Sequence, residues 1–305
     1  MTDSAPSFAD FVANWSLFRD AVLTGAFAGG LLGFLGVQVV LRRMVFASSA
    51  IAQAAALGVA LSFWIPSFLD PVGHAAHHSG NPGAHSAIPI VFDPVLWALG
   101  TSLLATLLFI VNPIRWRLTR ESLLGVVFLV SAAGAVIIGD RITQETHDLA
   151  AILFGSAVVV RRSDLILVSS ALVSLVGLHV LYWRPLIFVA FDPIGARVQG
   201  LPAGKLNAFV FLAIGVAVAF CTRALGALPV FAFSVLPALA ALLLTTHLGV
   251  VFALAGILGA LAGGGGYLVS FRAETPVGAT QTAVATVIFC VAIGWRAVMR
   301  FRTRR

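Results

Sequence analysis

The feature that most constrains this chain is a succession of long apolar runs separated by short polar breaks. A helix that crosses the hydrocarbon core of a bilayer needs about 20 apolar residues. Nine runs approach or exceed that length, and they cover 17–41, 45–69, 91–113, 121–139, 163–183, 205–224, 226–246, 249–271 and 277–298. Only 10% of the residues are charged and 60% are hydrophobic, a balance that cannot build a water-exposed surface. We therefore predict an all-α, multi-pass membrane protein with about nine membrane helices, or eight.

The basic residues predict how the chain is oriented. They cluster at Arg42 and Arg43, between Arg115 and Arg120, from Arg184 to Lys205, and in the tail FRTRR. Alternating crossings place all four clusters on one side, which the positive-inside rule assigns to the cytoplasm. We expect residues 1–16 outside the cell, a membrane domain over 17–298 and a basic cytoplasmic tail over 299–305. The exceptions, which fall on the predicted outer side, are Arg141, Arg161, Arg162, Arg223 and Arg272.

Residues 140–162 interrupt the regular pattern. They read DRITQETHDLAAILFGSAVVVRR, and their apolar stretch of roughly a dozen residues is too short to span a bilayer. We predict a short re-entrant or interfacial helix here. A full crossing would instead invert every later element and move the basic tail outside.

Glycines and prolines mark two further stretches. Gly25, Gly29 and Gly33 are spaced four apart, and 263–266 is a run of four glycines; both patterns predict close helix packing, or in the second case a local break. No Lys follows the glycine run as a phosphate-binding loop requires, so we expect ATP to bind elsewhere. Pro229 and Pro237 predict a kinked or broken span, which we interpret as either a gate or a simple kink.

Polar side chains inside apolar runs are candidate sites. Ser49 and Gln53 are four residues apart and therefore share one helix face. They indicate either a binding site or hydrogen bonding between helices. His179 lies inside another span, and we expect it to bond a neighbouring helix.

A histidine-rich loop follows the second run. Its sequence over 70–90 predicts an external loop that holds His74, His77, His78 and His85. Imidazole is a common zinc ligand, so the loop is a candidate for zinc capture. The alternative is a solvated loop with no specific role.

Four blocks resemble the transmembrane permease subunits of ABC importers for zinc and manganese. They are RRM and LGVA around the second span, DLAAILFGS from Asp148, FDPIGARVQGLP from Phe191, and GALPVFAFSVLPALAA with ETPVGAT. The resemblance implies a pair of permeases, two cytoplasmic ATPases and an extracytoplasmic metal-binding protein. It also implies that 190–205 is a coupling segment that docks on the ATPase through the pattern of Asp192, Ala196 and Gly200.

The resemblance is broken at one important place. The family carries an aspartate and a histidine where this chain has Ser49 and Gln53, and a hydroxyl and an amide are poorer ligands for a dication.

The function we expect is a non-enzymatic permease subunit of an ATP-driven, binding-protein-dependent importer of divalent metal, zinc first and manganese second. It would lie in the inner (plasma) membrane among lipid, with no nucleic-acid partner and no cofactor of its own. The first alternative is the same scaffold carrying a chelated metal or another solute. The others are an ATP-independent transporter or channel, and a non-transporting assembly subunit.

Overall fold

The computed structural model describes residues 11, 15–69, 93–110, 119–142 and 160–303, and within these ranges every regular element is a helix. The helices are α2 (Trp15–Leu41), α3 (Val45–Leu69), α5 (Pro94–Ile110), α6 (Arg120–Ile142), α8 (Arg162–Leu181), α9 (Trp183–Phe191), α10 (Pro193–Val198), α11 (Ala203–Leu225), α12 (Ala227–Leu244), α13 (Leu248–Ala273) and α14 (Val277–Thr303).

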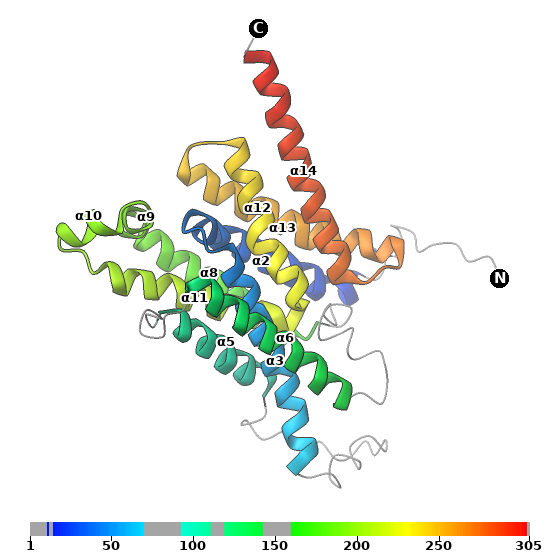
Figure 1. Cartoon of the computed structure of the whole chain (residues 1–305). Helices are drawn as coiled ribbons and strands as arrows, with labels where there is room; N and C mark the ends of the chain where they lie inside the picture. Colours follow the sequence, from blue (N-terminus) through cyan, green and yellow to red (C-terminus); the bar gives the residue numbers. More distant parts are fainter. Residues whose placement is uncertain (1–10, 12–14, 70–92, 111–118, 143–159, 304–305) are drawn as a thin grey trace.

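The all-α, multi-pass prediction is confirmed. Eight of the helices are long and apolar enough to cross a membrane, and the ninth apolar helix, α5, has 17 residues. Each of the nine corresponds to one predicted run. Figure 1 shows them as a bundle from which the last part of α14 projects toward the C-terminus.

The tightest packing joins α2 to α13. A Cβ atom added at Gly29 would collide with the carbonyl of Gly259, and one added at Gly263 would collide with the carbonyl of Gly25. Because only hydrogen atoms separate the two backbones there, the helices approach as the small-residue pattern predicts. The glycine run 263–266 lies inside the continuous helix α13, so the local break that we considered is wrong.

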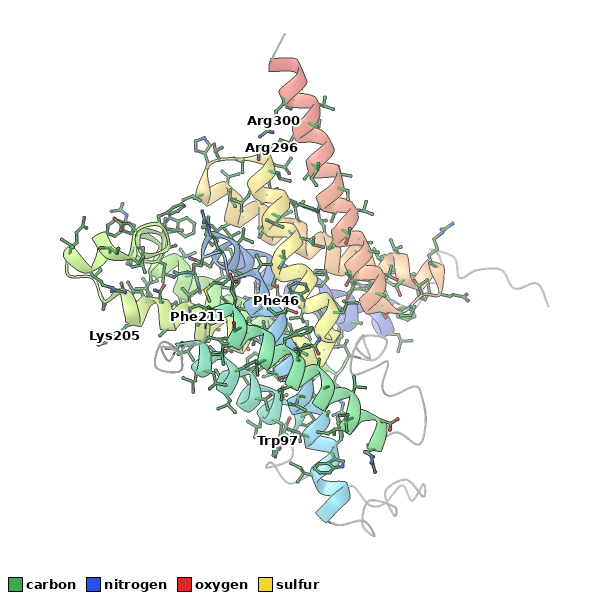
Figure 2. The ribbon with its side chains drawn as sticks, in the orientation of Figure 1. Phe46, Trp97, Lys205, Phe211, Arg296 and Arg300 are labelled. Atoms are coloured by element: carbon green, nitrogen blue, oxygen red, sulfur yellow. The ribbon has the colours of Figure 1, made fainter. Side chains whose placement is uncertain are left out.

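Contacts between distant helices define the two ends of the bundle. At one end, Arg42 contacts the backbone of Leu186 and the side chain of Asn207, and Arg296 contacts the last carbonyls of α12. We call this the basic end because it carries Arg42, Arg43, Arg184, Arg197, Lys205, Arg296 and Arg300. Figure 2 shows Lys205 beside the α10 region and Arg296 and Arg300 on the projecting part of α14.

The opposite end is defined by an ion-pair cluster. Arg223 lies 3.4 Å from Asp164 and 3.8 Å from Asp93, so α8 begins where α11 ends. Helix α6 lies beside α3, with Phe128 near Phe46. It reaches this end at Ile142. The predicted re-entrant or interfacial helix lies outside the described residues, but the helices flanking it end and begin at the same end of the bundle. Which end faces the cytoplasm stays a prediction.

Helix α12 differs from one sequence-based expectation. It runs without interruption from Ala227 to Leu244 with Pro237 inside it, so of the two predicted outcomes, a kinked or a broken span, the break is wrong and the kink stays a prediction. Pro229 is the third residue of the helix, where the backbone amide has no intrahelical acceptor to lose. Pro237 does remove one amide, the one that would bond to the carbonyl of Phe233.

Candidate functional site

The predicted polar pair lies on α3, the helix that packs between α5, α6, α11 and α12. At 100° per residue, Gln53 falls on the α3 face that holds Phe46, whose ring lies 5.3 Å from that of Phe128 on α6. Ser49 falls between that face and the one that holds Ser48, which contacts α12. The pair therefore follows the α3 surface between α6 and α12.

Ser49 and the side-chain oxygen of Gln53 are both removed from solvent, and polar atoms removed from solvent need hydrogen-bond partners. Ser49 is 7% exposed. The side-chain oxygen of Gln53 is buried and has no hydrogen-bond partner within the described part of the chain. A buried acceptor without a donor costs about 1–3 kcal/mol, so this amide is a candidate contact for something that enters the site.

The hydrogen bond between α3 and α12 is made by Ser48, the residue next to Ser49. Ser234 Oγ on α12 donates to Ser48 Oγ at 2.9 Å, and both side chains are buried. From the sequence we considered a hydrogen bond between helices at Ser49 or Gln53. In the structure Ser48, one residue before Ser49, makes that bond. Ser234 lies between the two prolines of α12, so this bond holds the proline-containing helix against α3.

The predicted coupling segment forms a short helix with defined ends. Asp192 Oδ1 accepts a hydrogen bond from the amide of Gly195 at 2.8 Å and caps α10. Ala196 is completely buried. Gly200 has φ +80° and ends the helix in a Schellman motif, because Leu201 N donates to Ala196 O and Gly200 N to Arg197 O. The spacing of Asp192, Ala196 and Gly200 is thus a cap, a packing contact and a left-handed terminus.

Most of α10 faces away from the protein. Ile194 is 71% exposed and Val198 is 83% exposed. Figure 1 shows α9 and α10 at the edge of the bundle, away from the bodies of the long helices. Two exposed aliphatic side chains on a well-capped helix give a partner protein an apolar surface to contact.

Arg42 links this end of the bundle to the start of α3. Its guanidinium donates to Asn207 Oδ1 on α11 and lies 3.5 Å from the carbonyl oxygen of Leu186 on α9. Burial lowers the pKa of Arg42 to about 10, so the side chain stays protonated at neutral pH. Arg43 follows with φ +57°, and the chain turns there into α3. The sequence placed Arg42 in a basic cluster and in the RRM block of the family resemblance, and neither predicted this contact.

The sequence also did not predict the ion pairs of Arg223. It disagreed with the positive-inside rule, and the structure gives the reason: its side chain is 16% exposed and pairs with Asp164 and Asp93. A paired arginine is stabilised locally and says little about which side it faces. Its partners are 59 and 130 residues away in the sequence, so no short motif could have identified them.

The histidine predictions have two outcomes. His74, His77, His78 and His85 lie outside the described residues. His179 is 1% exposed and its Nδ1 lies 2.8 Å from the carbonyl oxygen of Leu175, one turn back on its own helix. The expected bond to a neighbouring helix is therefore wrong. Among the described residues no group of three or more His, Cys, Asp or Glu side chains is placed to hold a metal ion.

The arrangement of long apolar helices defines a class: a multi-pass helical membrane protein with a short capped helix, α10, at its basic end. Residues 14–296 match the model of the ABC 3 transport family. The chain belongs to this family, whose members are membrane subunits of ABC transporters and not enzymes.

Three known proteins illustrate the relationship. The manganese transport system membrane protein MntC of Halalkalibacterium halodurans is 25% identical over 93% of this chain and 89% of the relative. The chelated iron transport system membrane protein YfeC of Yersinia pestis is 26% identical over 76% of this chain and 81% of the relative. The solved structure of PsaBC from Streptococcus pneumoniae in complex with Fab is similar with a TM-score of 0.76, at 20% identity, over 94% of this chain and 95% of that one.

These comparisons confirm the family predicted from the four sequence blocks. The protein is a permease subunit of a metal-ion ABC importer, embedded in the inner membrane and dependent on a separate ATPase subunit.

Proposed function

We propose that this permease carries a divalent metal ion, manganese rather than zinc, along the α3 surface that bears Ser49 and Gln53. The observation that carries the proposal is the buried, unpartnered side-chain oxygen of Gln53 next to buried Ser49. Hydroxyl and amide oxygens are hard donors, which suit Mn²⁺ better than Zn²⁺, whereas imidazole and thiolate favour zinc. The relative MntC is named for manganese transport, which supports the same cargo.

Neither Ser49 nor Gln53 supplies negative charge to balance a dication. In a site of low dielectric constant that absence weakens binding, and it favours an ion that keeps part of its water shell. We therefore infer a weak pathway site, in which the amide and hydroxyl orient the waters of a hydrated ion. Tight capture would then belong to the extracytoplasmic binding protein.

Energy would reach this site from the basic end. In the proposed assembly two permeases pair, the basic end faces the cytoplasm, and an ATPase contacts Ile194 and Val198 on α10. Movement of α10 would pass through α9 and α11 to Arg42, and from there to the turn that begins α3. This route supports alternating access as a rigid-body movement of helices, with Pro229 and Pro237 as candidate gate residues on α12.

A second candidate cargo is a chelated metal. One specific observation favours it: the residues that replace the family's aspartate and histidine are neutral, and a chelate brings its own ligands and charge. The relative YfeC is named for chelated iron.

Uptake by the assembled transporter tests the proposal. The permease is reconstituted with its ATPase and binding protein in liposomes, and radioactive Mn²⁺, Zn²⁺ and chelated Fe³⁺ are compared. We expect ATP-dependent Mn²⁺ uptake. Chelate uptake without Mn²⁺ uptake would favour the second candidate, and preferred Zn²⁺ uptake would contradict the assignment of manganese. The double variant Ser49→Asp with Gln53→His restores the family ligands. If only the double variant moves a bare dication, the native cargo is not a bare ion.

A further inference from the structure

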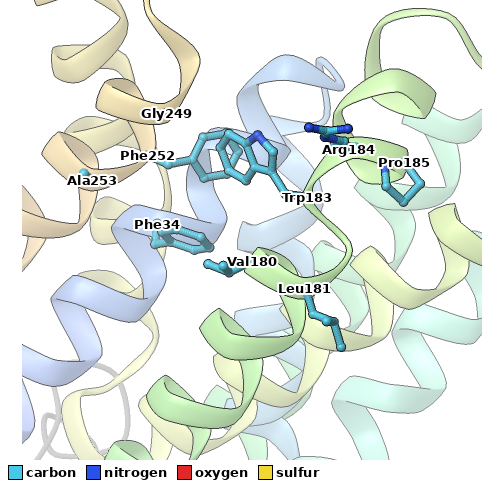
Figure 3. Close-up of a pocket in the computed structure, with 9 residues that line it drawn as sticks. All are labelled: Phe34, Val180, Leu181, Trp183, Arg184, Pro185, Gly249, Phe252 and Ala253. Carbon is cyan, nitrogen blue, oxygen red and sulfur yellow. The ribbon is translucent and has the colours of Figure 1, made fainter.

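A large open groove lies at the basic end, away from the α3 site. Its volume is about 690 Å³, within the range of about 300–1,000 Å³ typical of small-molecule sites. Three rings form its apolar floor: Phe252 lies 5.0 Å from Phe34 and 4.8 Å from Trp183, both as edge contacts. Figure 3 shows these rings with Val180 below them and the guanidinium of Arg184 beyond Trp183.

The groove lies beside the last turn of the membrane helix α8. Helix α8 ends at Leu181, and Arg184 follows in the first turn of α9. Val180 is 60% exposed and Leu181 is 72% exposed, as expected of side chains that face lipid. The apolar wall therefore lies at the depth of acyl chains, while Arg184 lies where the headgroups begin.

Arg184 has no charged or hydrogen-bonding partner among the described residues. The other end of the protein supplies such partners to Arg223, but the basic end has few acids. Its described carboxylates are Glu121, in the first turn of α6, and Asp192, which caps α10. Opposing them are seven described arginines and lysines. Neither of these two described carboxylates pairs with Arg184, so its guanidinium is open to an anion supplied by the surroundings of the protein.

We propose that the groove binds an acidic phospholipid of the leaflet at the basic end, with its phosphate on Arg184 and one acyl chain over Phe34, Trp183 and Phe252. A guanidinium forms paired hydrogen bonds with phosphate oxygens. Basic pockets between membrane helices are suited to acidic headgroups. The site is independent of the metal pathway, so this inference does not rest on the proposed cargo.

Two protein occupants fit the groove less well. A soluble ATPase would have to reach the lipid-facing side chains Val180 and Leu181, which lie in the membrane. A second permease copy would have to offer a carboxylate to Arg184, and the described carboxylates at this end are the two named above. Both occupants remain as outcomes of the test.

Native mass spectrometry of the permease with its ATPase tests the site. Phosphatidylglycerol or phosphatidylcholine is titrated into the detergent-solubilised complex, and bound lipid is counted. Arg184→Gln removes the phosphate contact. Gly249→Leu fills the groove, since a Cβ at Gly249 meets no atom within 4 Å and the backbone tolerates it. Lys205→Gln is the matched control, because it removes one exposed positive charge at the same end.

We expect Arg184→Gln to weaken phosphatidylglycerol binding about fivefold and to leave phosphatidylcholine unchanged. Gly249→Leu should weaken both lipids, and Lys205→Gln should weaken neither. Equal binding of both lipids to the native complex, or an unchanged affinity in Arg184→Gln, would overturn the proposal. So would efficient cross-linking of Leu181→Cys to a second copy or to the ATPase, measured with the exposed Cys290 changed to Ser.

Discussion

Arg42 donates a hydrogen bond to Asn207, which joins the turn before α3 to the helix that follows α10. The two partners are 165 positions apart in the sequence, and the segment between them contains both the polar surface of α3 and the whole of α10. In the mechanism proposed above, ATPase closure at α10 alters access at α3, and this hydrogen bond would help to transmit that movement.

Loss of this contact should uncouple transport. Arg42→Gln shortens the side chain and removes the charge, and the lost charged hydrogen bonds cost about 2 kcal/mol. We expect a lower thermal unfolding midpoint and a larger loss of metal uptake than of ATP hydrolysis. Uptake and hydrolysis are measured on the same liposomes.

Arg43 supplies the control for that variant. It is exposed and has φ +57°, a conformation that asparagine adopts readily. Arg43→Asn removes a neighbouring charge and should leave both rates near those of the native protein. An equal loss of uptake in the two variants would mean that net charge at this end matters and the contact with Asn207 does not.

The ion pair at the opposite end gives a second prediction. Arg223→Gln leaves Asp164, which is 8% exposed, without its partner at 3.4 Å. Breaking one side of a buried pair costs about 3 kcal/mol, so the unfolding midpoint should fall clearly. Adding Asp164→Asn removes the stranded carboxylate and should recover part of the loss.

A double-mutant cycle on Arg223 and Asp164 measures their coupling directly. Additive effects of the two substitutions would contradict the pairing. Asp140→Asn provides a comparison, because Asp140 is exposed and its substitution should leave the unfolding midpoint unchanged.

The sequence predicted those parts of the fold that depend on local pattern. Apolar length predicted the nine long helices, and glycine spacing predicted a close helix contact, which the structure places between α2 and α13. The residues Asp192, Ala196 and Gly200 carried the family resemblance, and the structure shows that they end and pack a short helix through a cap and a left-handed terminus, which act over a few residues. Arg42 with Asn207, and Arg223 with Asp164, could not be predicted, because each pair depends on how distant helices pack.

The sequence likewise predicted some features of the candidate site and not others. Helical periodicity placed Ser49 and Gln53 on one surface, and the structure buries Ser49 and the side-chain oxygen of Gln53. It did not reveal that Ser48 makes the bond to Ser234, since that depends on the rotation of α3 against α12. Proline chemistry predicted a kinked or broken α12, and the helix is continuous through Pro237. The external histidines lie outside the described residues, so the zinc-capture hypothesis stays a prediction.

The cap of α10 gives a third prediction, on coupling. Asp192→Ala removes the acceptor for the amide of Gly195 and costs about 1 kcal/mol of helix stability. Asp192→Asn keeps an acceptor oxygen. If α10 must be rigid to contact the ATPase, the alanine variant should lose substrate-stimulated ATP hydrolysis and the asparagine variant should retain most of it. Equal loss in both would show that the carboxylate charge, and not the cap, is required.

The glycine contact between α2 and α13 allows the sharpest test of packing, because one helix provides both variant and control. Gly259→Ala places a methyl group against the carbonyl of Gly29, whereas a Cβ at Gly265 meets no atom within 4 Å. Overpacking costs about 1–3 kcal/mol, so Gly259→Ala should lower the unfolding midpoint of the purified permease. Gly265→Ala should leave it unchanged or raise it, because alanine favours the helix by up to about 1 kcal/mol. If both variants behaved alike, helix propensity would account for these glycines and close backbone contact would not.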